Sequence, residues 1–184
     1  MSANVYDYVT YEEFLNYPSD DSKVEYYNGQ VIYNSSTHPI HNKIQNNVYF
    51  QLRQLFQDHW EIYTSGVAIK FETEDGVYQF TPDLFMVCNN KGFNGSIYTG
   101  EPLLVVEVLS KDTESRDRGI KLDIYGKCGV ATYWIIDIDK QEIVEYTCNV
   151  RGEFRTKSTP VVGSHFEITG NLFDLAEVFQ KKTI

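Results

Sequence analysis

Two strand-like segments that each enclose one carboxylate constrain this chain most. In TPDLFMVC, Asp83 follows Pro82 at the head of an apolar run, and in PLLVVEVLS, Glu107 lies between Val106 and Val108. Apolar, β-branched residues on both sides of Glu107 indicate a strand that is buried on both faces. An ionised carboxylate is costly there unless a positive group meets it. The sequence therefore predicts a positive partner for Glu107 in the interior of the protein.

The residues alone leave two kinds of partner open. In one interpretation the carboxylates are structural and pair with the basic residues that follow them. In the other, Asp83 and Glu107 meet across neighbouring strands and hold a hard divalent cation through their oxygen atoms. Buried acids mark functional sites, but structural ion pairs bury acids too.

The size and composition of the chain indicate one globular domain over residues 1–184. Of its 184 residues, 42% are apolar, which suffices for a core without disulfides or metals. No apolar run approaches the roughly 20 residues of a membrane span, so no membrane association is expected. The start, MSANVYDYVTYEEF, lacks the basic and apolar regions of a signal peptide. We therefore expect a cytoplasmic protein.

The net charge of −10 restricts the partners of the protein. A nucleic-acid surface gains most of its affinity when Lys and Arg neutralise phosphates, and an acidic chain is poorly suited to a broad surface of that kind. A local basic strip or bound cations can still offset the acids. The charge therefore counts against a nucleic-acid partner.

Two local signals organise the N-terminal part of the chain. Thr10 and Glu13 form a capping box, which predicts a short helix after Thr10. The run SKVEYYNGQVIYN predicts a hairpin around Asn28 and Gly29, the pair preferred in a type I′ turn, with Glu25 in its first arm.

Residues 39–58 predict a long amphipathic helix that carries His41 beside its apolar stripe. Apolar residues recur there every four positions, which is typical of a helix with one buried face. These residues are Ile40, Ile44, Val48, Leu52 and Phe56.

The later elements favour a mixed sheet. Short strands follow residue 60, and the Gly- and Asn-rich run NNKGFNGSIYTGEP predicts a mobile loop close to any site. Helices are expected over residues 112–127 and over NLFDLAEVF, the latter with Asp174 and Glu177 on its solvated face. A helix, several antiparallel strands, a helix and further strands indicate a mixed α/β (α+β) sheet, in contrast to an alternating doubly wound one.

The segment KDTESRDRGIKLDIYGK is basic in an otherwise acidic protein. On a helix, Arg118, Lys121 and Tyr125 fall on one face. The helix is either solvated and salt-bridged, with Asp117 and Lys121 as an i, i+4 pair, or it begins where the Glu107 strand ends and leans over the acids. In the second case these residues could catalyse hydrolysis. The acids would bind a metal, the metal would activate a water molecule, and a lysine would orient that water.

Together these motifs resemble the Uma-type family of restriction-endonuclease-like proteins, a branch of the PD-(D/E)XK nuclease superfamily. The shared features are Pro-Asp at the head of a strand, Glu-Val-Leu-Ser in the next, Arg-Asp-Arg-Gly-Ile-Lys-Leu-Asp-Ile-Tyr, and Gly-Val-Ala-Thr-Tyr-Trp-Ile-Ile-Asp. Val-Glu-Tyr-Tyr-Asn-Gly-Gln-Val and the His41 helix also match, so the resemblance spans most of the chain. It implies a restriction-endonuclease-like core with an N-terminal helix and hairpin.

The resemblance also implies roles for particular residues. Asp83 and Glu107 match the motif acids that bind Mg²⁺ or Mn²⁺. The superfamily lysine usually stands two residues after the second acid, but Leu109 occupies that position here. In the Uma-type pattern the lysine moves to the following helix, where Lys121 matches, and Lys111 is the alternative.

Two further positions recur in the family. Glu25 matches one of them, as a third acid near the metal, and His41 matches the other, as a group that supports the metal ligands or handles a proton. A zinc pair of His38 and His41 is the weaker alternative, because no third ligand has suitable spacing.

The function implied by the resemblance is that of a Mg²⁺-dependent endonuclease that hydrolyses phosphodiester bonds in DNA. A structure-selective or partner-delivered nuclease fits the acidic charge better than one that coats duplex. Two alternatives remain open. One is a catalytically silent binding or regulatory module in which the acids and Lys121 form a structural ion-pair network, and the other is a metal-dependent phosphoesterase for a small nucleotide. A homodimer is expected from the general frequency of symmetric oligomers.

Overall fold

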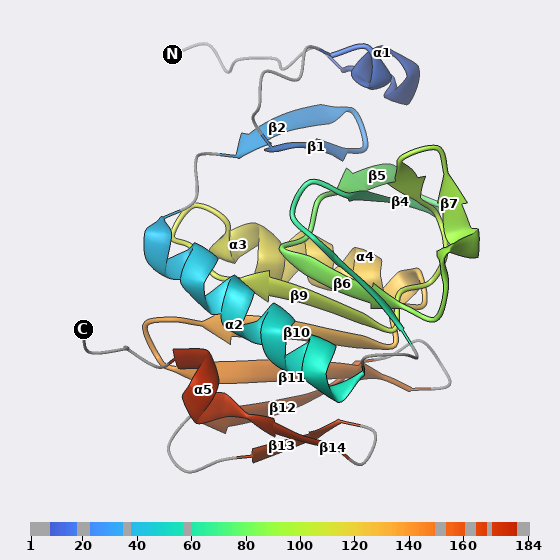
Figure 1. The fold of residues 1–184 in the computed structure, drawn as a ribbon. Coiled ribbons are helices and arrows are strands. Elements are labelled where there is room, and N and C mark those ends of the chain that lie inside the picture. Colours follow the sequence, from blue (N-terminus) through green and yellow to red (C-terminus); the bar gives the residue numbers. More distant parts are fainter. Residues whose placement is uncertain are drawn as a thin grey trace, which may run out of the picture.

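The computed structural model of the protein describes residues 8–17, 23–34, 38–56, 60–149, 154–160, 165–168 and 171–179. Within these ranges, two six-stranded sheets and a two-stranded one are accompanied by helices on the outside (Figure 1). No helix of the described residues is long and apolar enough to cross a membrane.

The central sheet carries both acid-bearing segments. Its strand order is β12-β11-β10-β9-β6-β3, in which β9 and β10 are parallel and the other neighbours are antiparallel. The predicted mixed sheet is therefore confirmed. The strands are β3 (Glu61–Thr64), β6 (Leu84–Val87), β9 (Leu104–Val108), β10 (Thr132–Asp137), β11 (Glu142–Cys148) and β12 (Phe154–Pro160).

The second sheet has the order β2-β1-β5-β4-β8-β7. Its strands are β1 (Lys23–Tyr27), β2 (Gln30–Asn34), β4 (Ala68–Thr73), β5 (Gly76–Phe80), β7 (Phe93–Asn94) and β8 (Ile97–Tyr98). The small sheet pairs β13 (His165–Ile168) with β14 (Asn171–Asp174).

Helices cover the central sheet on two sides (Figure 1). The long helix α2 (Pro39–Leu55) and the short α5 (Leu175–Phe179) pack on one face, and the second sheet and α4 (Leu122–Lys127) pack on the other. The remaining short helices are α1 (Tyr11–Leu15), η1 (Asn90–Gly92), α3 (Glu114–Arg116) and the π turn η2 (Asp117–Lys121).

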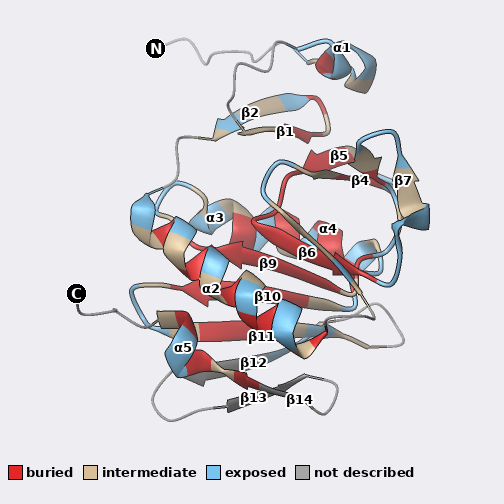
Figure 2. Ribbon diagram, viewed as in Figure 1, coloured by how far each residue is buried: buried red, intermediate tan, exposed pale blue. Residues whose placement is uncertain are grey.

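Strand β9 is buried on both faces, as its sequence predicts (Figure 2). Its side chains alternate between two cores because successive residues of a strand point to opposite faces. Val106 and Val108 pack against the α2 side, and Val105 packs against the second sheet. Glu107 has the parity of Val105, so its carboxylate enters the layer between the two sheets.

The N-terminal predictions are confirmed. The capping box is formed, with the Thr10 hydroxyl accepting from the Glu13 backbone and the Glu13 carboxylate accepting from the Thr10 backbone. The hairpin turns at Asn28 and Gly29 with φ angles of 41° and 101°, the two positive values that a type I′ turn requires. Tyr27 then pairs with Gln30, and this register fixes every other pair of the hairpin.

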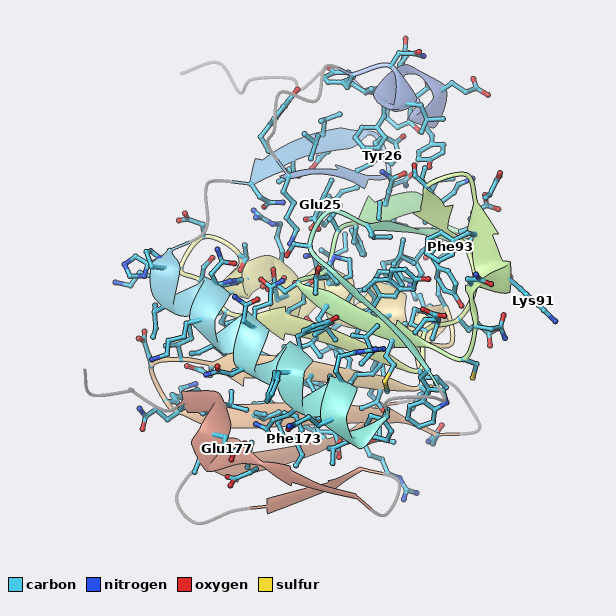
Figure 3. The ribbon with its side chains drawn as sticks, in the orientation of Figure 1. Glu25, Tyr26, Lys91, Phe93, Phe173 and Glu177 are labelled. Carbon is cyan, nitrogen blue, oxygen red and sulfur yellow. The ribbon has the colours of Figure 1, made fainter. Side chains whose placement is uncertain are left out.

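Two predictions of the later chain are wrong. The loop predicted near the site instead forms η1, β7 and β8 at the far edge of the second sheet, and none of its residues lines the cleft described below. Lys91 points away from Glu25 there (Figure 3). The closing segment is half strand: it continues β14 to Asp174, whose carboxylate accepts from the Ala176 backbone and caps α5.

Helix α2 forms as predicted but ends at Leu55, and residues 57–59 lie outside the described part of the chain. We expect Leu52→Ala to lower the free energy of unfolding by about 2–5 kcal/mol, because Leu52 is fully buried against the central sheet. Phe50→Ala on the same helix is the matched control, since Phe50 is 62% exposed and should change stability by less than about 0.5 kcal/mol. Urea unfolding followed by circular dichroism measures both, and equal losses would contradict the burial of this face.

Candidate active site

Asp83 and Glu107 meet at one end of the central sheet. Strands β6 and β9 pair Leu84 with Val106 in antiparallel register, so the next residues outward, Asp83 and Glu107, face each other across the strands. The Asp83 backbone N–H donates to Oε2 of Glu107 at 3.3 Å, and Oδ2 of Asp83 accepts from the Val108 backbone at 2.9 Å. The predicted approach of the two acids is therefore found.

Asp83 is held by two basic side chains from different elements. Lys23 of β1 lies 3.3 Å from Oδ1, and Nε2 of His41 on α2 lies 3.0 Å from Oδ2. Burial alone would raise the pKa of Asp83, but the charge of Lys23 and the hydrogen bond from His41 outweigh it and hold this pKa well below its usual value. Burial likewise opposes the charged form of His41, yet Asp83 raises the pKa of that imidazole.

Glu107 has a different environment, because it is almost completely buried. Its Oε1 accepts from Nζ of Lys121 at 2.9 Å and from the Tyr125 hydroxyl at 3.1 Å. Burial raises the pKa of Glu107 to about 7, since the opposing charge of Lys121 compensates only part of the lost hydration. The two acids of the site therefore differ in protonation: Asp83 stays ionised, whereas Glu107 titrates near neutral pH.

Lys121 is shared among three carboxylates, which explains why it cannot fully ionise Glu107. Its Nζ lies 2.9 Å from Glu107, 3.1 Å from Glu25 and 3.3 Å from Asp117. Burial lowers the pKa of Lys121, but these three carboxylates outweigh it and raise that pKa well above its usual value. One ammonium facing three acids leaves excess negative charge beside Glu107, and this charge favours the protonated form of that carboxyl.

The π turn η2 places this lysine. Asp117, Lys121 and Tyr125 are spaced by four residues and all are buried. A π turn takes more residues per turn than an α-helix, so residues four apart stay close to one face where η2 continues into α4. The sequence alternative of a solvated Asp117–Lys121 pair is therefore wrong: the pair is in the interior.

Arg118 does not join this face, contrary to expectation. Its guanidinium contacts Glu114 at 2.9 Å and Asp137 at 2.8 Å instead. Lys111 lines the cleft but is exposed, and no ion pair of it with a described residue is found. Lys121, and not Lys111, is therefore the lysine in contact with Glu107.

Glu25 is the common anchor of the site. Its Oε1 accepts from the Thr81 backbone at 2.9 Å, and its Oε2 accepts from Tyr27 at 2.9 Å and from Asn34 at 3.1 Å. Burial raises the pKa of Glu25, but the charge of Lys121 and these donors outweigh it and lower that pKa. With its oxygen atoms already engaged, Glu25 is placed to position Lys121 and Asn34. Figure 3 shows Glu25 projecting from β1.

Sequence reasoning missed Lys23 and Asn34, although a signal was available. Lys23 lies two residues before Glu25 in a strand, so both side chains share a face. A two-residue turn fixes the hairpin register and sets Asn34 opposite Lys23. His38, which the sequence offers only as the weaker alternative of a zinc pair with His41, caps α2, with Nδ1 accepting from the Ile40 backbone at 3.3 Å.

A cleft of about 690 Å³ opens onto these residues. Its walls come from the hairpin, the start of α2, the ends of β9 and β10, and the segment that leads into α3. Asp83, Glu107, Lys121, His41 and Lys23 all line it, whereas Glu25 is not among its lining residues. Four of the five predicted site residues thus reach one cleft.

The donor set at the bottom of the cleft fits a hard divalent cation. Mg²⁺ is often held by one or two carboxylates, with water and substrate phosphate completing the shell, and Asp83 and Glu107 supply two adjacent carboxylates. No group of three or more His, Cys, Asp or Glu side chains suited to a metal occurs among the described residues. The role of Glu25 as a third acid near the metal stays a prediction.

Comparisons with known proteins agree with the fold. A crystal structure described as "a putative nuclease belonging to DUF820 from Anabaena variabilis" is similar, with a TM-score of 0.76 and 18% sequence identity over 93% of this chain and 97% of the other. A search of proteins with curated function finds no match. The restriction-endonuclease-like fold is therefore shared with a solved structure.

The family model Uma2, described as "Putative restriction endonuclease", matches residues 11–165. The chain belongs to this family. The resemblance inferred from the motifs is thereby confirmed.

The raised pKa of Glu107 predicts a pH dependence of stability. Because the folded pKa of about 7 exceeds the ordinary value of 4.5, the folded protein binds more protons than the unfolded chain between these values. The metal-free wild type should therefore lose stability as pH rises from about 4.5 to 7, and Glu107→Gln should lack this loss.

Urea midpoints across this pH range, measured in EDTA, test the prediction. Glu12→Gln is the control, because Glu12 is exposed and its removal should leave the wild-type profile unchanged. A Glu107→Gln profile parallel to that of the wild type would show that Glu107 does not titrate in this window.

Proposed function

We propose that this protein is a metal-dependent nuclease that hydrolyses phosphodiester bonds in DNA. The observation that carries the proposal is the convergence of Asp83, Glu107 and Lys121 at the bottom of one cleft. Membership of the Uma2 family and the fold shared with a protein described as a nuclease support it.

In this proposal Asp83 and Glu107 hold Mg²⁺ or Mn²⁺. When bound, the ion supplies Lewis acidity toward a phosphoryl oxygen and acidifies a water molecule. Lys121 orients the Glu107 carboxylate and places positive charge beside the site where negative charge develops. His41 fixes the Asp83 carboxylate through Nε2, and Glu25 fixes Lys121.

A specific observation favours a second candidate, a binding or regulatory module without catalysis. Lys23 and His41 already contact both oxygens of Asp83, and Lys121 contacts Glu107, so the acids are compensated without an ion. A metal at this site has to displace Lys23 or share Asp83 with it. The side chain of Lys23 is 26% exposed, so it can move toward solvent.

Asp83→Asn and Glu107→Gln should each reduce metal-dependent cleavage by at least about a hundredfold, because each removes a charged ligand. Asp123→Asn is the matched control: this acid is 57% exposed, pairs with Lys127 and lies outside the cleft, so cleavage should persist. The assay compares duplex DNA, single-stranded DNA, RNA and nucleotides at low salt with Mg²⁺ or Mn²⁺. Undiminished cleavage by either site variant would contradict the assignment of Asp83 and Glu107 as the metal ligands of a nuclease.

Metal binding should depend on pH because Glu107 must lose its proton to act as a ligand. Mn²⁺ affinity is expected to rise with pH up to about 7 and to level off above it, with proton release on binding. Calorimetric titration in two buffers of different ionisation enthalpy measures both quantities. Absence of binding at millimolar Mn²⁺ by the wild type would favour the non-catalytic module.

A further inference from the structure

Arg116 stands out in the cleft because it is half-buried without an ion-paired carboxylate, whereas Lys111, which also lacks an ion pair with a described residue, is exposed. The other basic groups at the bottom of the cleft are paired: Lys23 and His41 with Asp83, and Lys121 with three acids. Within the described part of the chain, Arg116 forms no ion pair with a carboxylate. Its side chain lines the same cleft.

The hydrogen bonding of Arg116 is also incomplete. Its Nη2 donates to Oδ1 of Asn34 at 2.7 Å, but its buried Nε has no hydrogen-bond partner among the described residues. A guanidinium carries five N–H donors in a planar fork, and a buried donor without a partner is costly. The fork matches two oxygen atoms of a phosphate group, which would supply both the missing acceptor and the missing negative charge.

The neighbours of Arg116 hold it in place without neutralising it. Asn34 accepts from Arg116 through its carbonyl oxygen and donates through its amide to Oε2 of Glu25 at 3.1 Å. Glu25 holds Lys121 through its other oxygen at 3.1 Å, and Lys121 reaches Glu107. The guanidinium is therefore tied, through the half-buried Asn34, to Glu25, which also positions the lysine of the site.

We propose that Arg116 is the phosphate-binding residue of the cleft, which takes one phosphate of a nucleic-acid strand, and that Asn34 and Glu25 position its guanidinium. The inference rests on the proposed function, because it identifies the anion as part of the nuclease substrate. It also reconciles a nucleic-acid substrate with the net charge of −10, because the affinity would come from direct phosphate contacts within the cleft and would not need a broad basic surface.

The test uses fluorescence anisotropy of a fluorescein-labelled oligothymidylate in EDTA, so that no metal contributes to phosphate binding. Arg116→Gln should weaken binding about tenfold at low salt, because a charge-assisted hydrogen bond is lost. The slope of log affinity against log salt should become shallower by about 0.7, the contribution of one phosphate contact in a single strand. Arg53→Gln is the control of equal charge change: Arg53 is exposed on α2 and outside the cleft, so affinity and slope should stay at the wild-type values.

Two further variants distinguish the contribution of the planar guanidinium geometry from that of the positive charge. Arg116→Lys keeps the positive charge but loses the planar pair of donors, so it should retain the wild-type salt slope with several-fold weaker binding. Asn34→Ala releases the guanidinium and should weaken binding with the slope preserved. If circular dichroism shows that Arg116→Gln does not fold, the binding of Arg116→Lys and Asn34→Ala tests the proposal instead, and wild-type affinity of both variants would overturn it.

Failure of this inference is distinguishable from failure of the proposed function. If the Arg116→Gln variant binds the oligonucleotide with the same affinity and salt slope as Arg53→Gln, the phosphate-binding role of Arg116 is wrong, even if the wild type cleaves DNA with Mg²⁺. The same holds if the metal-free wild type does not bind the oligonucleotide at low salt. Arg116-dependent binding without metal-dependent cleavage by the wild type supports the phosphate site and rejects the nuclease.

Discussion

The burial of the Lys121 ammonium among three carboxylates is the interaction on which the arrangement of the site depends. The transfer of an ammonium from water into the protein interior costs several kcal/mol of free energy unless well-placed partners offset it. Removing one partner from such a network leaves an uncompensated charge. The three acids come from β1, β9 and the π turn, so the network joins the hairpin, the central sheet and the helix that follows β9. The position of Lys121 therefore fixes these three elements against one another.

The same arrangement separates the behaviour of the two central acids. Asp83 lies at the head of β6, where Lys23 and His41 can reach it from opposite sides of the sheet. Glu107 lies inside β9 and shares its one cation with two other acids. A site with one permanently ionised carboxylate and one that titrates near neutral pH is suited to bind a cation reversibly.

The net charge of −10 and the nuclease family appear to conflict only if affinity must come from a wide basic surface. The acidic groups near the cleft are mostly matched by cations, and the guanidinium of Arg116 is held by a neutral amide. A guanidinium without an ion-paired carboxylate is thereby held inside an otherwise charge-matched cleft. Under the proposed function, a substrate strand would be recognised at the cleft itself, and the rest of the acidic surface would repel it.

The sequence by itself determined much of the fold. The capping box, the Asn28-Gly29 turn, the four-residue periodicity of α2 and the doubly buried β9 are local or periodic signals, and each corresponds to the observed element. The motifs also identified the two acids, the lysine, Glu25 and His41 as the candidate set. Local signals suffice for these features because turn geometry and side-chain periodicity are set by neighbouring residues.

Only the tertiary structure decided how these residues are used. No local pattern predicts a π turn, so the sequence placed Arg118 beside Lys121 and left open whether the Asp117–Lys121 pair is solvated or buried. The roles of Glu25 as an anchor and of Arg116 as an uncompensated cation depend on contacts between β1, β2 and the segment after β9, which are distant in sequence. The physical reason is that burial and charge compensation are properties of the assembled interior, where groups from separate elements compete for the same partners.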